Sequence, residues 1–123
     1  MTFLTASPDD NEPRPGNPAG RVGPFVGIGL PQALAIALAG PRPIIMIDAG
    51  AIPVAGLNRL EDAEVGCLLL GWEVDALDVI AMLLAVGYRG AVTVVAPPLP
   101  DPAMVERELS RASRAITVTL AVR

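Results

Sequence analysis

Five short apolar runs alternate with four segments of helical composition, and this alternation limits the fold more than any other feature of the chain. The apolar runs span residues 25–29, 43–48, 66–70, 91–96 and 116–122. The segments of helical pattern span residues 31–40, 55–64, 75–87 and 101–114. Strands that alternate with helices pair in parallel through right-handed crossovers. The sequence therefore predicts an α/β protein, a three-layer α/β/α sandwich around a parallel, five-stranded sheet.

Residue types at the ends of the helical segments predict where several helices begin and end. Asp75 and Asp101 are expected N-caps, because their side chains can accept hydrogen bonds from free amides of the first turn. Gly40 and Gly87 follow two of the helices, at the position where glycine commonly ends a helix. The β-branched run at 43–48 predicts a buried strand.

The first 24 residues differ in composition from the rest of the chain. Residues 1–24 contain five prolines and three glycines, and they show no apolar periodicity. Proline fixes φ and lacks an N–H group, which disfavours both helices and sheet ladders. We therefore expect a flexible, proline-rich arm at 1–24 and a single α/β domain at 25–123. An arm that lies across an apolar surface, anchored by Phe3, Leu4 and Val22, is the alternative.

The composition excludes several classes of function. The net charge is −4 and aromatic residues make up 3% of the chain, so we expect no nucleic-acid binding. The chain has no histidine and all nine basic residues are arginine, which excludes a histidine base, a P-loop lysine and a Schiff-base lysine. The apolar segment 76–88 is too short to span a bilayer and contains Asp78, so we expect no membrane partner and a cytoplasmic location. Cys67 is expected to be a buried core residue.

Three segments resemble parts of response-regulator receiver domains. GCLLLG (66–71) stands where the third strand of that family would be, and GYRGAVTVVA (87–96) is similar to its turn into the fourth strand. PDPAMVERELSRA (100–112) resembles the fourth helix of the family. The resemblance implies a receiver fold, which is flavodoxin-like, but Gly71 occupies the place of the phospho-accepting aspartate and Ala96 that of a serine or threonine. It therefore implies a degenerate receiver with no catalytic residue, no metal site and no cofactor.

The segment 75–87 predicts a helix with almost no polar face, because its polar residues are Asp75 and Asp78 alone. A helix on the outside of a sandwich normally has a polar face toward solvent. We therefore expect a second copy, a partner protein or the arm to cover the outer side of this helix. The lone tryptophan follows the central strand, where it serves either as an interface anchor or as filling for the emptied pocket. We therefore predict a non-catalytic signalling domain that acts by protein–protein interaction or homodimerisation. The predicted contact residues are Trp72, Leu77, Ile80 and Leu84.

A nucleotide-binding module is the main alternative. Gly27 and Gly29 form part of a G-x-G-x-x-G pattern between a strand and a helix, and Asp48 ends the next strand where a ribose-binding acid would lie. Pro31 and Gln32 weaken this pattern, since the first removes an amide donor and the second replaces the third glycine.

A second alternative is a metal site at the carboxyl edge of the sheet. Asp48, Glu73 and Asp75 would supply the carboxylate ligands.

Overall fold

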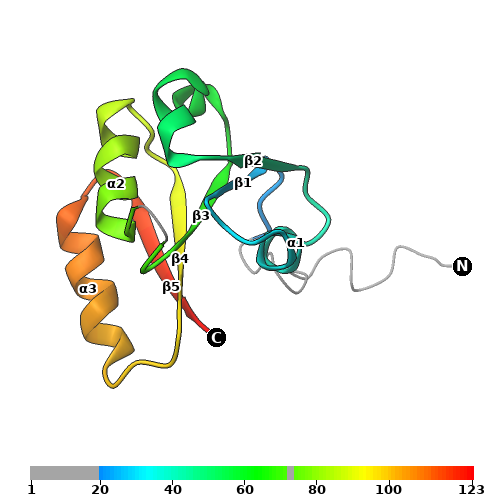
Figure 1. Cartoon of the computed structure of the whole chain (residues 1–123). Helices are drawn as coiled ribbons and strands as arrows, with labels where there is room; N and C mark the ends of the chain where they lie inside the picture. Colours follow the sequence, from blue (N-terminus) through cyan, green and yellow to red (C-terminus); the bar gives the residue numbers. More distant parts are fainter. Residues whose placement is uncertain (1–19, 72–73) are drawn as a thin grey trace, which may run out of the picture.

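The computed structural model describes residues 20–71 and 74–123. Five strands form one all-parallel sheet in the order β2-β1-β3-β4-β5, as in flavodoxin-like folds (Figure 1). The strands are β1 (Phe25–Ile28), β2 (Ile44–Ile47), β3 (Glu64–Leu68), β4 (Ala91–Ala96) and β5 (Thr117–Val122). The helices are α1 (Gln32–Ala39), α2 (Ala76–Ala85) and α3 (Pro102–Ala112). The predicted fold class is confirmed.

The sheet separates two apolar layers of unequal size. The helix α1 lies on one face of the sheet, and α2 and α3 lie on the other (Figure 1). Beneath α2 and α3 the larger core includes Val79, Ile80 and Leu83 of α2 and the inward side chains of β3 and β4. Beneath α1 a smaller cluster forms around Phe25 and Leu38. The helix α2 therefore covers the centre of the sheet, where strands buried on both faces are expected.

The predicted helix ends are confirmed. The Asp75 side chain accepts a hydrogen bond from the Asp78 amide at 3.0 Å, and the Asp78 side chain accepts one from the Asp75 amide, which completes a capping box. The Asp101 carboxylate accepts from the Met104 amide at 3.1 Å at the start of α3. Gly87 follows α2 with φ of 82°, a conformation that favours glycine.

The turn from α2 into β4 is built around Tyr88. This side chain is buried, and its hydroxyl donates to a carbonyl, that of Ala91 at 2.8 Å or that of Ala63 at 3.3 Å. A Cβ on Gly90 would lie 2.5 Å from the same hydroxyl oxygen, so a small residue is needed there. The GYRG sequence thus serves the structure of this turn, as expected.

The connection from β2 to β3 differs from the prediction. Instead of a helix over 55–64, it contains two 3₁₀ segments, η2 (Ala49–Val54) and η3 (Leu57–Arg59). Pro53 lies inside the first segment, and Gly56 has φ of 70°, so an α-helix cannot run through either position. The strand β3 begins at Glu64, two residues before its predicted start at 66.

The strand β2 was predicted to be buried, and this prediction is wrong. Among the described residues, the strand lies at the edge of the sheet and pairs with β1 alone. Ile44, Ile45 and Met46 are between 37% and 43% exposed, whereas β1 is buried along its whole length. An apolar run predicts burial on both faces only when the strand lies in the interior of the sheet. Whether a strand is interior or at an edge depends on the order of all the strands, so the residues of the strand itself do not determine it.

A buried ion pair fastens the start of β2 to the start of β3. The Arg42 guanidinium lies 2.8 Å from the Glu64 carboxylate, and both side chains are largely shielded from solvent. Arg42 also donates to the carbonyls of Leu38 and Ala39 at the end of α1, and the Thr93 hydroxyl donates to Glu64. These bonds tie α1, β3 and β4 together at the amino-terminal edge of the sheet.

Residues 20–24, which were assigned to the arm, contact the domain. The Val22 amide donates to the Asp62 carboxylate at 2.7 Å, and Arg21 forms an ion pair with the same carboxylate. The Pro24 carbonyl accepts from the Glu64 amide at 3.1 Å. The rest of the predicted arm, residues 1–19, lies outside the described residues.

Candidate functional site

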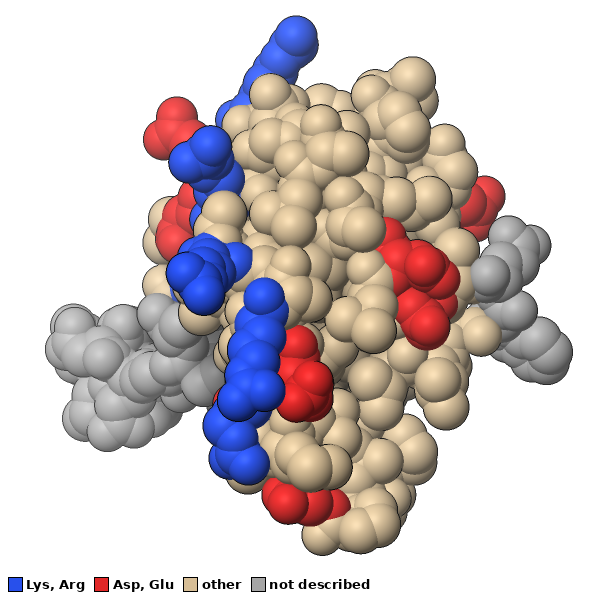
Figure 2. Space-filling model, turned by 90° about the vertical axis from the view of Figure 1, so that its left-hand side faces the viewer, with Lys and Arg blue, Asp and Glu red and all other residues tan. Residues whose placement is uncertain are grey.

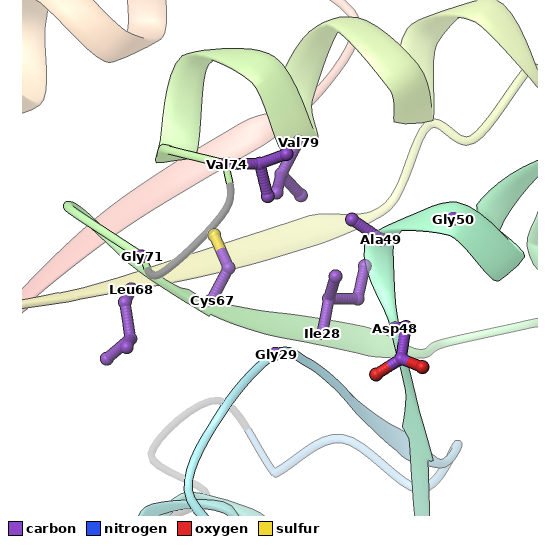
Figure 3. Close-up of a pocket in the computed structure, with 10 residues that line it drawn as sticks. All are labelled: Ile28, Gly29, Asp48, Ala49, Gly50, Cys67, Leu68, Gly71, Val74 and Val79. Atoms are coloured by element: carbon purple, nitrogen blue, oxygen red, sulfur yellow. The ribbon is translucent and has the colours of Figure 1, made fainter.

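A pocket of about 490 Å³ opens at the carboxyl edge of the sheet, between β1 and β3. The connection from β1 runs to one side of the sheet and the connection from β3 to the other, which makes this the usual ligand position in an open parallel sheet. Figure 3 shows its described lining, which comes from the ends of β1 to β3, the start of η2 and the region of α2. The lining residues are Ile28, Gly29, Asp48, Ala49, Gly50, Cys67, Leu68, Gly71, Val74 and Val79.

The inner wall of the pocket is apolar. The Cys67 sulfur points toward Val74 and Val79, and Ile28 and Ala49 lie beside it (Figure 3). Cys67 is 1% exposed, which confirms that it is a core residue. Burial raises the pKa of the Cys67 thiol to about 12, because the thiolate would lose its hydration there. The thiol is therefore protonated, and poorly nucleophilic, at neutral pH.

Asp48 is the only charged residue among the described residues that line the pocket. It lies at the end of β2, is exposed, and its carboxylate points away from Val79 in Figure 3. Asp75 is occupied as the cap of α2, and Glu73 lies outside the described residues. Within residues 20–71 and 74–123, no cluster of three or more histidine, cysteine or acidic side chains could hold a metal ion.

The three residues of the nucleotide alternative are divided between the two faces of the sheet. Gly29 and Asp48 line the pocket together. Gly27 lies in the middle of β1 on the α1 side, where a Cβ would lie 2.7 Å from the Met46 sulfur. The helix α1 begins at Gln32 after Pro31, and none of its residues lines the pocket. The amides at the start of α1 therefore do not point into this cavity.

One of the two positions taken from the receiver resemblance lines the pocket. Gly71 lines its mouth, three residues beyond the end of β3 at Leu68. A Cβ on Gly71 would collide with the Val74 carbonyl, so the backbone itself closes this side of the pocket. Ala96 ends β4 and is buried. Both positions thus carry small, apolar residues.

The predicted contact surface on α2 is smaller than expected. Leu77 is 51% exposed and Leu84 is half-buried, but Ile80 is 1% exposed and belongs to the core, so its assignment to a surface is wrong. The helix packs between η2 and α3, which covers most of its apolar residues. Trp72 lies outside the described residues.

Figure 2 shows the outer face of α2 and α3, where a column of arginine side chains borders a broad uncharged area. Arg107 and Arg111 of α3 and Arg114 just beyond its end line a shallow groove with Glu106 and Ser110. Glu108 forms an ion pair with Arg111 at 3.2 Å. The described part of the chain contains no helix with the length and apolar character needed to cross a membrane.

The sequence reasoning missed the apolar edge at β2. Ile44, Ile45 and Met46 form a continuous exposed run, and no charged residue interrupts them. A signal for this edge was present, since the flavodoxin-like strand order places the second strand outermost. The apolar composition of 43–48 pointed to burial instead.

Comparisons with protein-family models, with curated proteins and with solved structures each return no match for this chain. The likeness to receiver domains therefore rests on the strand order and on the sequence segments themselves.

Proposed function

We propose that this protein is a non-catalytic, receiver-like regulatory domain that acts by binding protein. One observation carries the proposal: the pocket at the switch point has an apolar inner wall where phosphorylation chemistry would require several carboxylates. A fold that keeps this architecture without the reactive groups offers its surface, rather than its pocket, for function.

The ionisable groups around the pocket support this proposal. The Cys67 thiol is kept protonated by burial, which raises its pKa to about 12. The Asp75 carboxylate is engaged by the Asp78 amide, which leaves Asp48 as the single exposed carboxylate among the described residues that line the pocket. Magnesium for phosphoryl transfer is held by several neighbouring acids, and the described lining supplies one.

Exposed apolar side chains support the choice of protein as the partner. The described surface exposes Ile44, Ile45 and Met46 on β2 and Leu77 on α2. The run on β2 is consecutive along the strand, and exposed apolar surface of this kind typically marks a protein contact.

The test is exposure of the full chain to acetyl phosphate and magnesium, followed by intact mass measurement. We expect the mass to stay unchanged at every incubation time. A stable adduct of one phosphoryl group would overturn the proposal, and peptide mapping would then show whether Asp48 carries it. The Asp48→Asn variant is the matched control, because it removes the rim carboxylate without changing the size of the side chain.

A small nucleotide-binding module is the second candidate, and the shared position of Gly29 and Asp48 in one pocket favours it. Titration with NAD while amide resonances are recorded would separate the two candidates. Saturable shifts at Gly29 and Asp48, with Gly27 on the opposite face unaffected, would support the nucleotide module. An unchanged spectrum is the result that our proposal requires.

A further inference from the structure

The outer edge of β2 carries backbone groups that have no hydrogen-bond partner among the described residues. The Pro43 carbonyl accepts from the Phe25 amide at 2.9 Å, and the Ile47 carbonyl accepts from the Gly29 amide at 3.1 Å. Alternate residues of a strand direct their backbone groups to the same side. Residues 43, 45 and 47 therefore face β1, while the N–H and C=O groups of Ile44 and Met46 face outward.

Apolar side chains flank these open groups on both faces of the strand. Met46 lies over Gly27 on the α1 side of the sheet, and Ile44 shares this face by the alternation of the strand. Ile45 and Ile47 lie on the opposite face, where Ile47 packs against the larger core. An edge with an open backbone and apolar residues on both faces is a template for pairing with another strand.

The charged residues next to β2 do not protect its edge. The Arg42 side chain points inward to Glu64, with 2% of it exposed. Asp48 follows the strand and lies at the rim of the pocket. Within Ile44–Ile47 there is neither a charge nor a proline, the two devices that most often block strand pairing.

We propose that a second copy of this chain pairs with β2, so that two β2 strands form an antiparallel ladder and the two sheets become continuous. This inference rests on the proposed function and names the partner, a second copy of the same chain. A two-fold axis perpendicular to the sheet makes the contact self-complementary and keeps both α1 helices on one side.

The alternation of backbone groups sets the register of the ladder. With the axis at Ile45, Ile44 lies opposite Met46 of the second copy, and each pair exchanges its outward N–H and C=O groups. Ile45 then faces its own symmetry mate as a close pair without backbone bonds, in which side chains touch. The two Asp48 residues lie about 20 Å apart along the ladder, beyond the range of strong repulsion.

The size of this contact determines the affinity that we expect. The ladder pairs Ile44, Ile45 and Met46 of each copy, so it buries less area than a standard protein interface. The dimer should therefore dissociate on dilution through the micromolar range rather than persist as an obligate complex.

Sedimentation velocity of the full chain over a wide concentration range tests the pairing. We expect a species of twice 12.7 kDa that gives way to the monomer on dilution. Ile45→Lys places two like charges face to face at the axis and should weaken the dimer at least about tenfold. Ile44→Pro removes an outward N–H while sparing the bonds to β1, and it should have a similar effect.

Val122→Lys is the matched control on the other edge of the sheet. Val122 is an apolar residue of β5 and is 42% exposed, close to the 39% of Ile45. The proposal requires this variant to dimerise like the unmodified chain. A dimer that survives Ile45→Lys, or one that is lost in Val122→Lys, would overturn it. Far-ultraviolet circular dichroism confirms that each variant is folded.

Amide hydrogen exchange distinguishes the occupants of the edge. Pairing with a second copy slows exchange at Ile44 and Met46 only at high protein concentration, while Ile45 and Ile47 are protected throughout. Protection of Ile44 and Met46 at every concentration would mean that residues 1–19 of the same chain occupy the edge. Rapid exchange at every concentration would mean that nothing does. Either of these results would overturn the proposal.

The two proposals can fail independently. A monomeric chain that gains no mass from acetyl phosphate would refute the β2 ladder and leave the protein-binding function with another partner. A dimer that gains a phosphoryl group would refute the non-catalytic function and leave the ladder in place.

Discussion

The two edge strands of the sheet, β2 and β5, differ in whether their outward backbone amides have hydrogen-bond partners. At β5 the Glu106 side chain, from α3, accepts a hydrogen bond from the Leu120 amide at 2.8 Å, and α3 packs along the strand. Leu120 directs its amide away from β4, because Thr117 and Arg123 donate to the carbonyls of β4 and of the preceding turn. At β2 the corresponding outward amides, those of Ile44 and Met46, have no partner in the described ranges 20–71 and 74–123.

This comparison shows that the direction of a charged side chain matters more than its presence near an edge. Each edge has one nearby charge that is engaged in hydrogen bonds, Arg42 at β2 and Glu106 at β5. Arg42 points into the protein and fastens the strand to its neighbours, whereas Glu106 lies along the edge and covers it. The first arrangement stabilises the monomer, and the second also makes the strand unavailable to another chain.

The largest effect is expected from removal of the inward charge at β2. Arg42→Met leaves the Glu64 carboxylate shielded and without its cation, and it also removes the bonds to the carbonyls of Leu38 and Ala39. Breaking a buried pair in this way costs about 3–5 kcal/mol of unfolding free energy. Urea denaturation of dilute, monomeric protein measures the loss.

The control for this prediction is an exposed pair of the same chemistry. Arg111 pairs with Glu108 on the surface of α3 at 3.2 Å, with both side chains mostly in solvent. Arg111→Met should change the unfolding free energy by less than about 1 kcal/mol. If the two variants were equally stable, Arg42 would not anchor β2. The proposed difference between the inward charge at β2 and the covering charge at β5 would then be refuted.

The second prediction opens the protected edge. Glu106→Ala leaves the partly buried Leu120 amide without its acceptor, at a cost of about 1–2 kcal/mol. Exchange at the Leu120 amide should become faster in the same variant. Glu106→Gln keeps an acceptor oxygen and should recover part of both effects. Unchanged exchange at Leu120 would show that α3, rather than the carboxylate, shields this edge.

Local sequence patterns predicted most helices and strands correctly. They predicted poorly which elements pack beside one another in the fold. The caps at Asp75 and Asp101 were found because a cap depends on residues within one turn. The burial of β2 was wrong because burial depends on which strands flank it, and nothing within 43–48 encodes that. The helix expected over 55–64 was wrong because two residues inside that segment, Gly56 and Asp62, have left-handed backbone with φ of 70° and 53°, which an α-helix cannot contain.

The candidate site shows the same limit. Gly29 and Asp48 were expected together, and they are, because both follow adjacent strands whose carboxyl ends meet at one edge. Gly27 was assigned to the same site from its spacing to Gly29, but β1 ends at Ile28 and Gly29 leaves the strand with φ of 59°, whereas Gly27 stays inside the strand on the α1 face. Ile80 was assigned to a contact surface, but it is buried. The sequence of a helix without a polar face does not indicate which side faces the core.

The third prediction concerns the helix that covers β5. Asp101→Ala removes the side-chain acceptor for the Met104 amide and should lower the unfolding free energy by about 1 kcal/mol. Fraying of the first turn of α3 should leave Leu120 protected, because Glu106 lies one turn further along the helix. Exchange measurements on Met104 and Leu120 check this division. Loss of protection at both would mean that the cap and the edge form one cooperative unit.

The smallest effect is expected at the start of α1, the helix nearest to β2. Its N-cap is Pro31, which makes no side-chain capping bond, in contrast to Asp101 at α3. Pro31→Ser would add an acceptor for the Leu34 amide, worth about 1 kcal/mol, but would lose most of this through the greater freedom of the unfolded chain. The net gain in unfolding free energy should be a few tenths of a kcal/mol, measurable by urea denaturation beside Asp101→Ala. A loss above about 1 kcal/mol would show instead that the rigid backbone of Pro31 holds the turn after Gly29, and hence the wall of the pocket.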